Sequence, residues 1–264
     1  MTWLYVKSRF IRTPLEGPMQ RLRDFAGTMS RLRHPELHEI HVEQDRIAQA
    51  MREIIQSDVN CIDIGCHIGS SLSLMLHCSP RGRHIAFEPL PEKAEWLRRK
   101  FPEVEIYGLA LGDKRDRLTF FQNLSRPGFS GFAKCHATRD VVIEHTVDCE
   151  MLDNLVGTDR KYRFLKIDVE GAELLVLRGA RQLIARDAPI ILFESSHDGA
   201  AKLGLKREDL YTFFVNELRY NIFMVKDFLE RRAALELAGF QEAAVYPFRA
   251  FNFLAIPQQG ESLI

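Results

Sequence analysis

The spacing of hydrophobic residues along the chain changes near residue 58, and this change divides the chain into two parts. Before it, apolar residues recur three and four positions apart, which predicts one helix around residues 22–32 and a second over residues 40–55. Residues 1–58 are therefore predicted to be a helical extension that packs on the rest or covers a site. Residues 59–264 are predicted to be the main domain.

After residue 58, short apolar runs alternate with helical patterns, which is typical of a parallel sheet covered by helices on both faces. The predicted strands are 59–64, 84–87, 104–109, 164–167, 189–193, 220–225 and 251–256. The predicted helices are 70–77, 91–101, 172–185, 207–218 and 226–238. The expected fold class is α/β, a doubly wound Rossmann-like sheet.

Residues 113–148 interrupt this alternation. Two apolar runs, 118–121 and 141–146, flank a polar, glycine-containing loop and predict an inserted β-hairpin. The loop carries Phe129 and Ser130, which we expect to cover a bound acceptor molecule. The alternative is an ordinary hairpin turn without a function.

The most informative motif follows the first predicted strand. Asp63 ends the strand, and Gly65, His67 and Gly69 lie in a Gly-x-x-x-Gly turn that leads into a helix. Doubly wound sheets bind ligands at the carboxyl ends of their strands, where glycine lets the backbone approach a ligand and Asp63 could pair with a cationic amine. The motif alone could also be a structural turn. The Gly-x-Gly-x-x-Gly string of nicotinamide enzymes is absent from the sequence.

Two further motifs fit the same crevice. Glu88 ends the second strand and Pro89 stops it, near the offset at which such folds place an acid on a ribose diol. Ala110 and Leu111 close the third strand with room for a flat ring, and Asp113 could accept from an exocyclic amine. The alternatives are a solvent-facing acid at position 88 and a plain Gly-Asp turn.

The fourth apolar run, 164–167, is followed by Asp168 and Glu170. Two carboxylates this close can raise one another's pKa, which suits a group that aligns or deprotonates a hydroxyl. They could instead cap the next helix, because acids favour helix N-termini. Lys166 could pair with one of them.

The fifth apolar run is followed by Glu194 and by His197, a second candidate base. Asp168 and Glu194 could hold a divalent cation that acidifies a hydroxyl. The sequence does not favour a metal over a metal-free site, and no metal ligand is assigned.

In this order the motifs resemble those of the FkbM family of methyltransferases, over residues 59–195. The most specific piece is the string from Lys166 to Glu173, Lys-Ile-Asp-Val-Glu-Gly-Ala-Glu. The resemblance implies a class I methyltransferase sheet with an antiparallel last strand, S-adenosylmethionine as methyl donor, and hydroxyls of sugars or natural products as acceptors. His67 stands where the family often has Asn, although a neutral His can still donate a hydrogen bond.

The resulting hypothesis is an S-adenosylmethionine-dependent O-methyltransferase. Its expected cofactor-binding residues are Asp63, Gly65, His67, Gly69, Glu88, Pro89, Ala110, Leu111, Asp113 and Asp168. Its expected acceptor-binding residues are Phe129, Ser130, Lys166 and Glu194, and its expected catalytic residues are Asp168, Glu170 and His197.

Composition limits the other possibilities. The chain has 36 basic and 36 acidic residues, so it lacks the basic surplus of proteins that bind nucleic acid. Its five cysteines form no C-x-x-C pair, and no signal peptide or long apolar segment is evident, so we expect a cytoplasmic protein. A cofactor-binding domain without activity, and a methyltransferase of protein or RNA, remain the alternatives. The N-terminal helices could form a homodimer.

Overall fold

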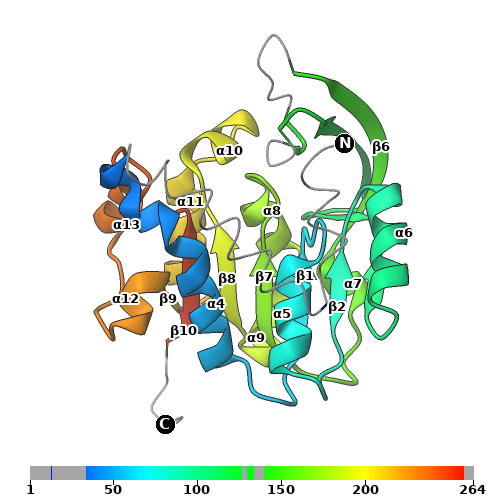
Figure 1. Cartoon of the computed structure of the whole chain (residues 1–264), viewed down its shortest axis with the longest axis horizontal. Helices are drawn as coiled ribbons and strands as arrows, with labels where there is room; N and C mark the ends of the chain where they lie inside the picture. The colour runs from blue at the N-terminus through cyan, green and yellow to red at the C-terminus, as the bar shows by residue number, and fades with distance from the viewer. Residues whose placement is uncertain (1–12, 14–33, 127–129, 134–139, 259–264) are drawn as a thin grey trace.

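The computed structural model describes residue 13 and residues 34–126, 130–133 and 140–258. The central sheet is built from β1 (Asn60–Ile64), β2 (Ile85–Phe87), β3 (Glu105–Tyr107), β7 (Tyr162–Ile167), β8 (Ile190–Glu194), β9 (Tyr220–Met224) and β10 (Asn252–Pro257). Its order is β3-β2-β1-β7-β8-β10-β9 (Figure 1). The first five of these strands run parallel, and β10 runs antiparallel to both β8 and β9. The predicted α/β doubly wound sheet with an antiparallel last strand is confirmed.

Helices cover both faces of this sheet, as expected for buried parallel strands. One face carries α4 (Glu43–Ile54), α5 (Ser70–Cys78), α6 (Pro91–Lys100) and α12 (Val225–Leu229). The other face carries α7 (Leu152–Leu155), α8 (Glu173–Arg178), α9 (Arg181–Asp187), α11 (Arg207–Thr212), the π-helix η3 (Phe213–Glu217) and α13 (Leu237–Ala243). The remaining helices in the described part of the chain are η1 (Pro35–Leu37), α3 (His38–His41) and α10 (His197–Lys202).

Alternation along each strand sends side chains into the two cores in turn. In β1, for example, Cys61 packs into the core under α4 and α5, whereas Ile62 and Ile64 pack into the core under α8 and α9. Asp63 lies two residues after Cys61 and therefore shares its face. This alternation decides which polar side chains meet at the carboxyl ends of the strands.

The described part of the predicted N-terminal extension packs directly on the sheet. Ile47, Ala50 and Met51 of α4 are buried in the same core as β1 and β10. The predicted helix over residues 40–55 is divided into α3 and α4, and the predicted helix at residues 22–32 lies outside the described residues. The boundary at residue 58 stays a prediction.

Two predicted helices are wrong in their extent. The helix predicted over residues 172–185 is divided at Gly179, where a Cβ atom would lie 2.0 Å from the carbonyl oxygen of Gly112. The helix predicted over residues 226–238 ends at Leu229, and Arg231 then takes a left-handed conformation with φ of 57°. At Gly179 the close packing against Gly112 interrupts the helix, although the local hydrophobic pattern is helical.

The insertion is a hairpin of β5 (Asp116–Asn123) and β6 (Val142–Glu150), longer than predicted. Ala110 and Leu111 do not extend the third strand of the central sheet, as predicted, but form β4 (Ala110–Leu111), which pairs with β6 in a second, three-stranded sheet. The chain leaves the central sheet after Tyr107, and the hairpin rises beyond the carboxyl ends of β1 and β2 (Figure 1). Among the described residues, no helix has the length and apolar character that a membrane span requires.

Candidate active site

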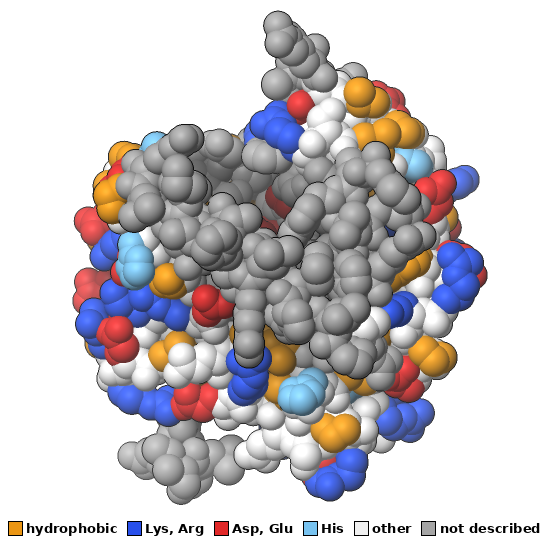
Figure 2. All heavy atoms as spheres, viewed as in Figure 1, with side chains coloured by type: hydrophobic (Ala, Val, Ile, Leu, Met, Phe, Trp, Pro, Cys, Tyr) orange, Lys and Arg blue, Asp and Glu red, His pale blue; other side chains and the backbone are white. Residues whose placement is uncertain are grey.

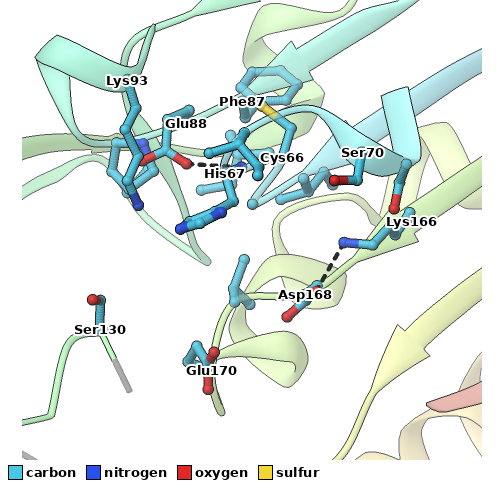
Figure 3. A pocket seen from close by; sticks show the side chains of 18 of the residues that line it. Cys66, His67, Ser70, Phe87, Glu88, Lys93, Ser130, Lys166, Asp168 and Glu170 are labelled. Carbon is cyan, nitrogen blue, oxygen red and sulfur yellow. Dashed lines mark hydrogen bonds and ion pairs between the residues drawn. The ribbon is translucent and has the colours of Figure 1, made fainter. Parts of the chain in front are cut away.

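A cavity of about 380 Å³ opens at the carboxyl ends of β1, β2 and β7 (Figure 3). Its walls come from the loops after these strands, from the start of α5, from α4 and β10, and from the hairpin. Of the predicted site residues, it is lined by Gly65, His67, Glu88, Pro89, Ala110, Leu111, Ser130, Lys166, Asp168 and Glu170. Segments far apart in the sequence therefore meet where the motifs predicted a site.

The two glycines of the first motif are required by contacts within the protein. Gly65 has φ of +78°, and a Cβ atom there would lie 1.9 Å from the carbonyl oxygen of Asp168. Gly69 has φ of +75° and precedes α5, and a Cβ atom there would lie 2.5 Å from the ring of Phe101. The loop after β1 is thus pressed against the loop after β7, and Gly69 is not part of the cavity wall.

Asp63 and Lys166 form a buried ion pair behind the cavity. They are Cα partners on β1 and β7, and Lys166 Nζ lies 3.7 Å from Asp63 Oδ1 and 3.0 Å from Asp168 Oδ2. Asp63 is fully buried, and burial, only partly offset by Lys166, raises its pKa to about 6. Asp63 therefore faces the ammonium group of Lys166 and is absent from the cavity wall.

Burial opposes the charge of Lys166, but Asp168 and Asp63 outweigh this effect and raise its pKa. Burial likewise works to raise the pKa of Asp168, yet the nearby ammonium group of Lys166 holds it below its usual range. Asp168 is therefore a carboxylate at neutral pH, and Lys166 is its counter-ion.

Glu88 lies at the opposite end of the cavity, at the carboxyl end of β2. Its Oε2 accepts a hydrogen bond from the backbone N–H of His67 at 3.0 Å, and its Oε1 accepts from the N–H of Leu90 at 3.1 Å. Burial raises its pKa, and the charge of Lys93 opposes that effect. His67 is held in a left-handed conformation with φ of 52°, so the two loops meet through this carboxylate.

Lys93 is a cavity residue that sequence reasoning missed. It lies in the first turn of α6, and its side chain runs beside Glu88 in Figure 3. Burial lowers its pKa, while Glu88 favours the charged form. Its place one helical turn after the Glu88-Pro89 string is the signal that could have identified it.

Three carboxyl groups meet at the other end of the cavity. Single oxygen atoms of Asp168, Glu170 and Glu194 all lie within 4.8 Å of one another, a spacing that a divalent cation could bridge. Glu170 has φ of 56° and its carboxyl group points into the cavity (Figure 3). Burial, followed by the charges of Asp168 and Glu173, raises its pKa to about 8. Burial and the charge of Asp168 raise the pKa of Glu194 as well.

Neither Asp168 nor Glu170 caps α8: its N-cap residue is Ala172, and no side-chain hydrogen bond caps this helix in the described part of the chain. The loop before α8 is instead held by Glu173, the first residue of the helix. Its Oε1 accepts from the backbone N–H groups of Val169 at 3.2 Å and of Gly171 at 3.1 Å, and its side chain is buried. Glu173 thereby holds the loop that presents Glu170 to the cavity.

The described part of the hairpin contributes to the cavity wall next to Glu170. Gly131 pairs with Phe121 of β5, and a Cβ atom at position 131 would lie 3.3 Å from Cβ of Glu170. Ser130 Oγ accepts from the N–H of Asn123 at 3.0 Å. The rings of Phe120 and Phe132 meet edge to face with centroids 5.5 Å apart. Ser130 and both rings line the cavity, and the role of this loop as a cover for the acceptor stays a prediction.

The other predicted site residues lie elsewhere. Asp113 is exposed and outside the cavity wall, and Glu194 reaches the site through its contact with Asp168. His197 begins α10, but its side chain is outside the described part of the structure, as is all of Phe129. Among the described residues visible in Figure 2, basic and acidic side chains are interspersed, without a broad patch of one sign.

Comparisons with known proteins agree with the resemblance seen in the motifs. The model of the FkbM methyltransferase domain matches residues 63–242. A curated relative, the AMB antimetabolite synthetase AmbE of Pseudomonas aeruginosa, is 28% identical over 188 residues, which are 56% of this chain and 9% of that protein. The chain thus spans only about a tenth of the length of this curated relative.

Two solved structures are similar in part. The FkbM methyltransferase of Methylobacillus flagellatus is 18% identical, with a TM-score of 0.47 over 76% of this chain and 44% of that chain. Fibrillarin of Aeropyrum pernix, solved with S-adenosylmethionine, is 13% identical, with a TM-score of 0.42 over 80% of this chain and 73% of that chain. Because the family model matches more than half of its length, the chain belongs to the FkbM family of methyltransferases.

Proposed function

We propose that this protein transfers a methyl group from S-adenosylmethionine to a hydroxyl group of a small molecule, in the class of sugars, glycoconjugates and natural products. The observation that carries the proposal is the distribution of acids around one cavity. Glu88 lies at one end, and Glu170 with Asp168 lies at the other. Glu88 is suited to bind a cofactor, and Glu170 and Asp168 are suited to orient a hydroxyl group and accept its proton.

The cofactor end fits S-adenosylmethionine. Each oxygen of Glu88 accepts one backbone hydrogen bond and keeps a second lone pair for a ribose hydroxyl. Ala110 and Leu111 offer an apolar wall for the adenine ring. The buried hydroxyl of Ser70, which borders the cavity, has no hydrogen-bond partner among the described residues. When bound, the cofactor supplies an electrophilic methyl group on a sulfonium centre.

The acceptor end is both polar and aromatic. Glu170, Asp168 and Ser130 offer groups that can align a hydroxyl, and Phe120 and Phe132 offer a flat surface for a sugar ring. Glu170 is the group proposed to take the proton, and Asp168 with Glu194 would orient the hydroxyl. Phe129 as an acceptor-binding residue and His197 as a catalytic residue stay predictions. The proposed compartment is the cytoplasm, since Cys61, Cys66, Cys78 and Cys149 are free thiols.

The deciding experiment is isothermal titration of the purified protein with S-adenosylmethionine, NAD and NADP in parallel. We expect binding of S-adenosylmethionine alone, in the micromolar range, followed by transfer of a labelled methyl group to a hydroxyl in an acceptor screen. A preference for a dinucleotide, or methylation of RNA or protein in place of small molecules, would contradict the proposal.

Replacing Glu88 with Gln should raise the dissociation constant of S-adenosylmethionine roughly tenfold to a hundredfold. A hydrogen bond to a charged group contributes about 1.5–3 kcal/mol, and about 1.4 kcal/mol corresponds to a factor of ten. Gln keeps the size of the side chain and one acceptor for the backbone. Titration calorimetry gives the constants, and the melting temperature reports any structural damage.

Glu92→Gln is the matched control, because Glu92 is an exposed acid in the first turn of the neighbouring helix. It should leave the affinity unchanged. Asp168→Ala should weaken cofactor binding less than Glu88→Ala does. Wild-type affinity in Glu88→Gln and in Glu88→Ala would show that the ribose does not lie on this carboxylate.

A further inference from the structure

Polar side chains form a row across the carboxyl edge of the sheet, on the face covered by α4 and α5. The strand register pairs Asp63 with Lys166, Lys166 with Leu192, and Glu194 with Asn252. Since residues two apart in a strand share a face, Asp168 and Glu194 lie on the same face. The row therefore runs from β1 through β7 and β8 and ends at Asn252 on β10.

The row is completed by Glu43, a buried acid at the start of α4. Its Oε1 accepts from the backbone N–H groups of Phe251 at 2.8 Å and Asn252 at 3.0 Å. Its Oε2 accepts from Asn252 Nδ2 at 3.1 Å. One carboxylate thus fixes both the start of β10 and the side chain of Asn252.

This contact decides which end of the Asn252 amide faces the cavity. A carboxylate can only accept hydrogen bonds, so the NH₂ group of Asn252 must point toward Glu43. Asn252 lines the cavity, and its Oδ1 receives no hydrogen bond from the described residues. The cavity is therefore presented with a fixed hydrogen-bond acceptor at this point, and Gln44 and Ile47 of α4 also line the cavity.

The position of Asn252 places its Oδ1 atom, the hydrogen-bond acceptor, far from the cofactor end of the cavity. Four strand spacings of about 4.8 Å, roughly 19 Å in total, separate β2 with Glu88 from β10. A cofactor with its ribose on Glu88 has its sulfonium only a few bonds away, and the space toward Asn252 is left for the methyl acceptor. Glu43 and Asn252 also lie outside residues 63–242, the part shared with the family.

We propose that Asn252, held by Glu43, is a specificity-determining residue that accepts a hydrogen bond from a hydroxyl of the methyl acceptor. The inference rests on the proposed function, since it assigns the methyl acceptor to this end of the cavity. A site built to accept from a hydroxyl discriminates against a deoxy compound, because the protein oxygen is then left unpaired. Helix α4, which carries Glu43, thereby contributes to the recognition of the methyl acceptor.

Three variants test the assignment. In Glu43→Gln the new NH₂ group faces Asn252, whose amide must turn over and present NH₂ to the cavity. In Asn252→Asp two carboxylates face each other across the 3.1 Å contact. In the double variant, the NH₂ of the glutamine at position 43 donates to the aspartate at position 252, and an acceptor oxygen faces the cavity again. Glu39→Gln is the control, because Glu39 pairs with Arg46 and Lys226 and not with β10.

The first readout is methyl transfer to a panel of methyl hexopyranosides and their monodeoxy derivatives. Glu43→Gln and Asn252→Asp should each raise the KM for the glycoside that serves as methyl acceptor about tenfold, as loss of one hydrogen bond predicts. The double variant should recover most of this loss, and Glu39→Gln should show none. Glu43→Gln should also lose the discrimination against one monodeoxy derivative, while its affinity for S-adenosylmethionine stays at the wild-type value.

The second readout does not require a methyl-acceptor substrate. Hydrogen exchange of the ¹⁵N-labelled Asn252 side-chain amide, identified by its absence in Asn252→Asp, should be slow in the wild type and faster in Glu43→Gln. Equal exchange in both proteins would overturn the assignment, as would a raised cofactor dissociation constant in Glu43→Gln. If the wild type methylates none of the glycosides, the sugar acceptor of the proposed function fails, whereas the amide exchange still decides how Asn252 is held.

Discussion

Replacing Glu170 with Gln should lower kcat for methyl transfer by about 10²–10⁴-fold, the usual contribution of a positioned general base. The side chain points into the cavity beside Asp168, and burial raises its pKa to about 8. A base must be deprotonated to act, so the wild-type rate should rise with pH and level off above this pKa. A cationic cofactor nearby favours the carboxylate, so the midpoint in the loaded enzyme should lie below 8.

The measurement is kcat as a function of pH for the wild type and for Glu170→Gln, with labelled S-adenosylmethionine. The variant should lose the rise with pH and keep its affinity for the cofactor. Glu105→Gln, an acid on β3 outside the cavity wall, is the control and should keep the full profile. Wild-type kcat with an unchanged profile in Glu170→Gln would remove Glu170 from proton transfer and leave Asp168 as the candidate.

Replacing Lys166 with Met should reduce the free energy of unfolding by about 3 kcal/mol at pH 8. Breaking a buried ion pair by removing one partner costs about 3–5 kcal/mol, and the lower value applies because the Asp168 side chain is 32% exposed. The loss should be clearly smaller at pH 5. The folded pKa of Asp63, about 6 in the wild type, lies above its unfolded value, so its protonation favours the folded state. Because Lys166 lowers this pKa, it lies higher still in the variant, and the penalty for the charge of Asp63 is gone at pH 5.

Urea unfolding at both pH values gives the free energies. Lys161→Met, at an exposed position just before β7, should change stability little. Adding Asp63→Asn to Lys166→Met should restore part of the loss, because a buried charge without a partner is removed. An equal loss at pH 5 and pH 8 would indicate that Lys166 stabilises the protein through packing.

The location of the site could be predicted because it follows from where parallel strands end. The apolar runs before Asp63, Glu88 and Asp168 identify buried strands, and the carboxyl ends of such strands lie at one edge of the sheet. The position of Glu170 in the cavity wall could also be predicted, because it lies in the same loop as Asp168. The sequence also predicts that Lys166 pairs with one of the carboxylates that follow its strand, and in the structure this partner is Asp168.

What could not be predicted depends on contacts between distant segments. Lys93 reaches the cavity from the first turn of α6, and Asn252 reaches it because β10 inserts between β8 and β9. The break at Gly179 depends on its packing against Gly112, which helical periodicity does not reveal. In the same way, the orientation of Asp63 toward Lys166 depends on the register of two strands about a hundred residues apart.

The contact between Gly65 and the carbonyl oxygen of Asp168 has a consequence for how this enzyme can change over evolution. Any side chain at position 65 would push the loop after β7 away, so the loop proposed to contact the methyl donor and the loop carrying Asp168 keep one fixed spacing. New acceptors must then be accommodated by parts that reach the cavity from outside this pair of loops. Those parts are α4, β10 and the hairpin, which can vary in sequence while the methyl donor stays in place.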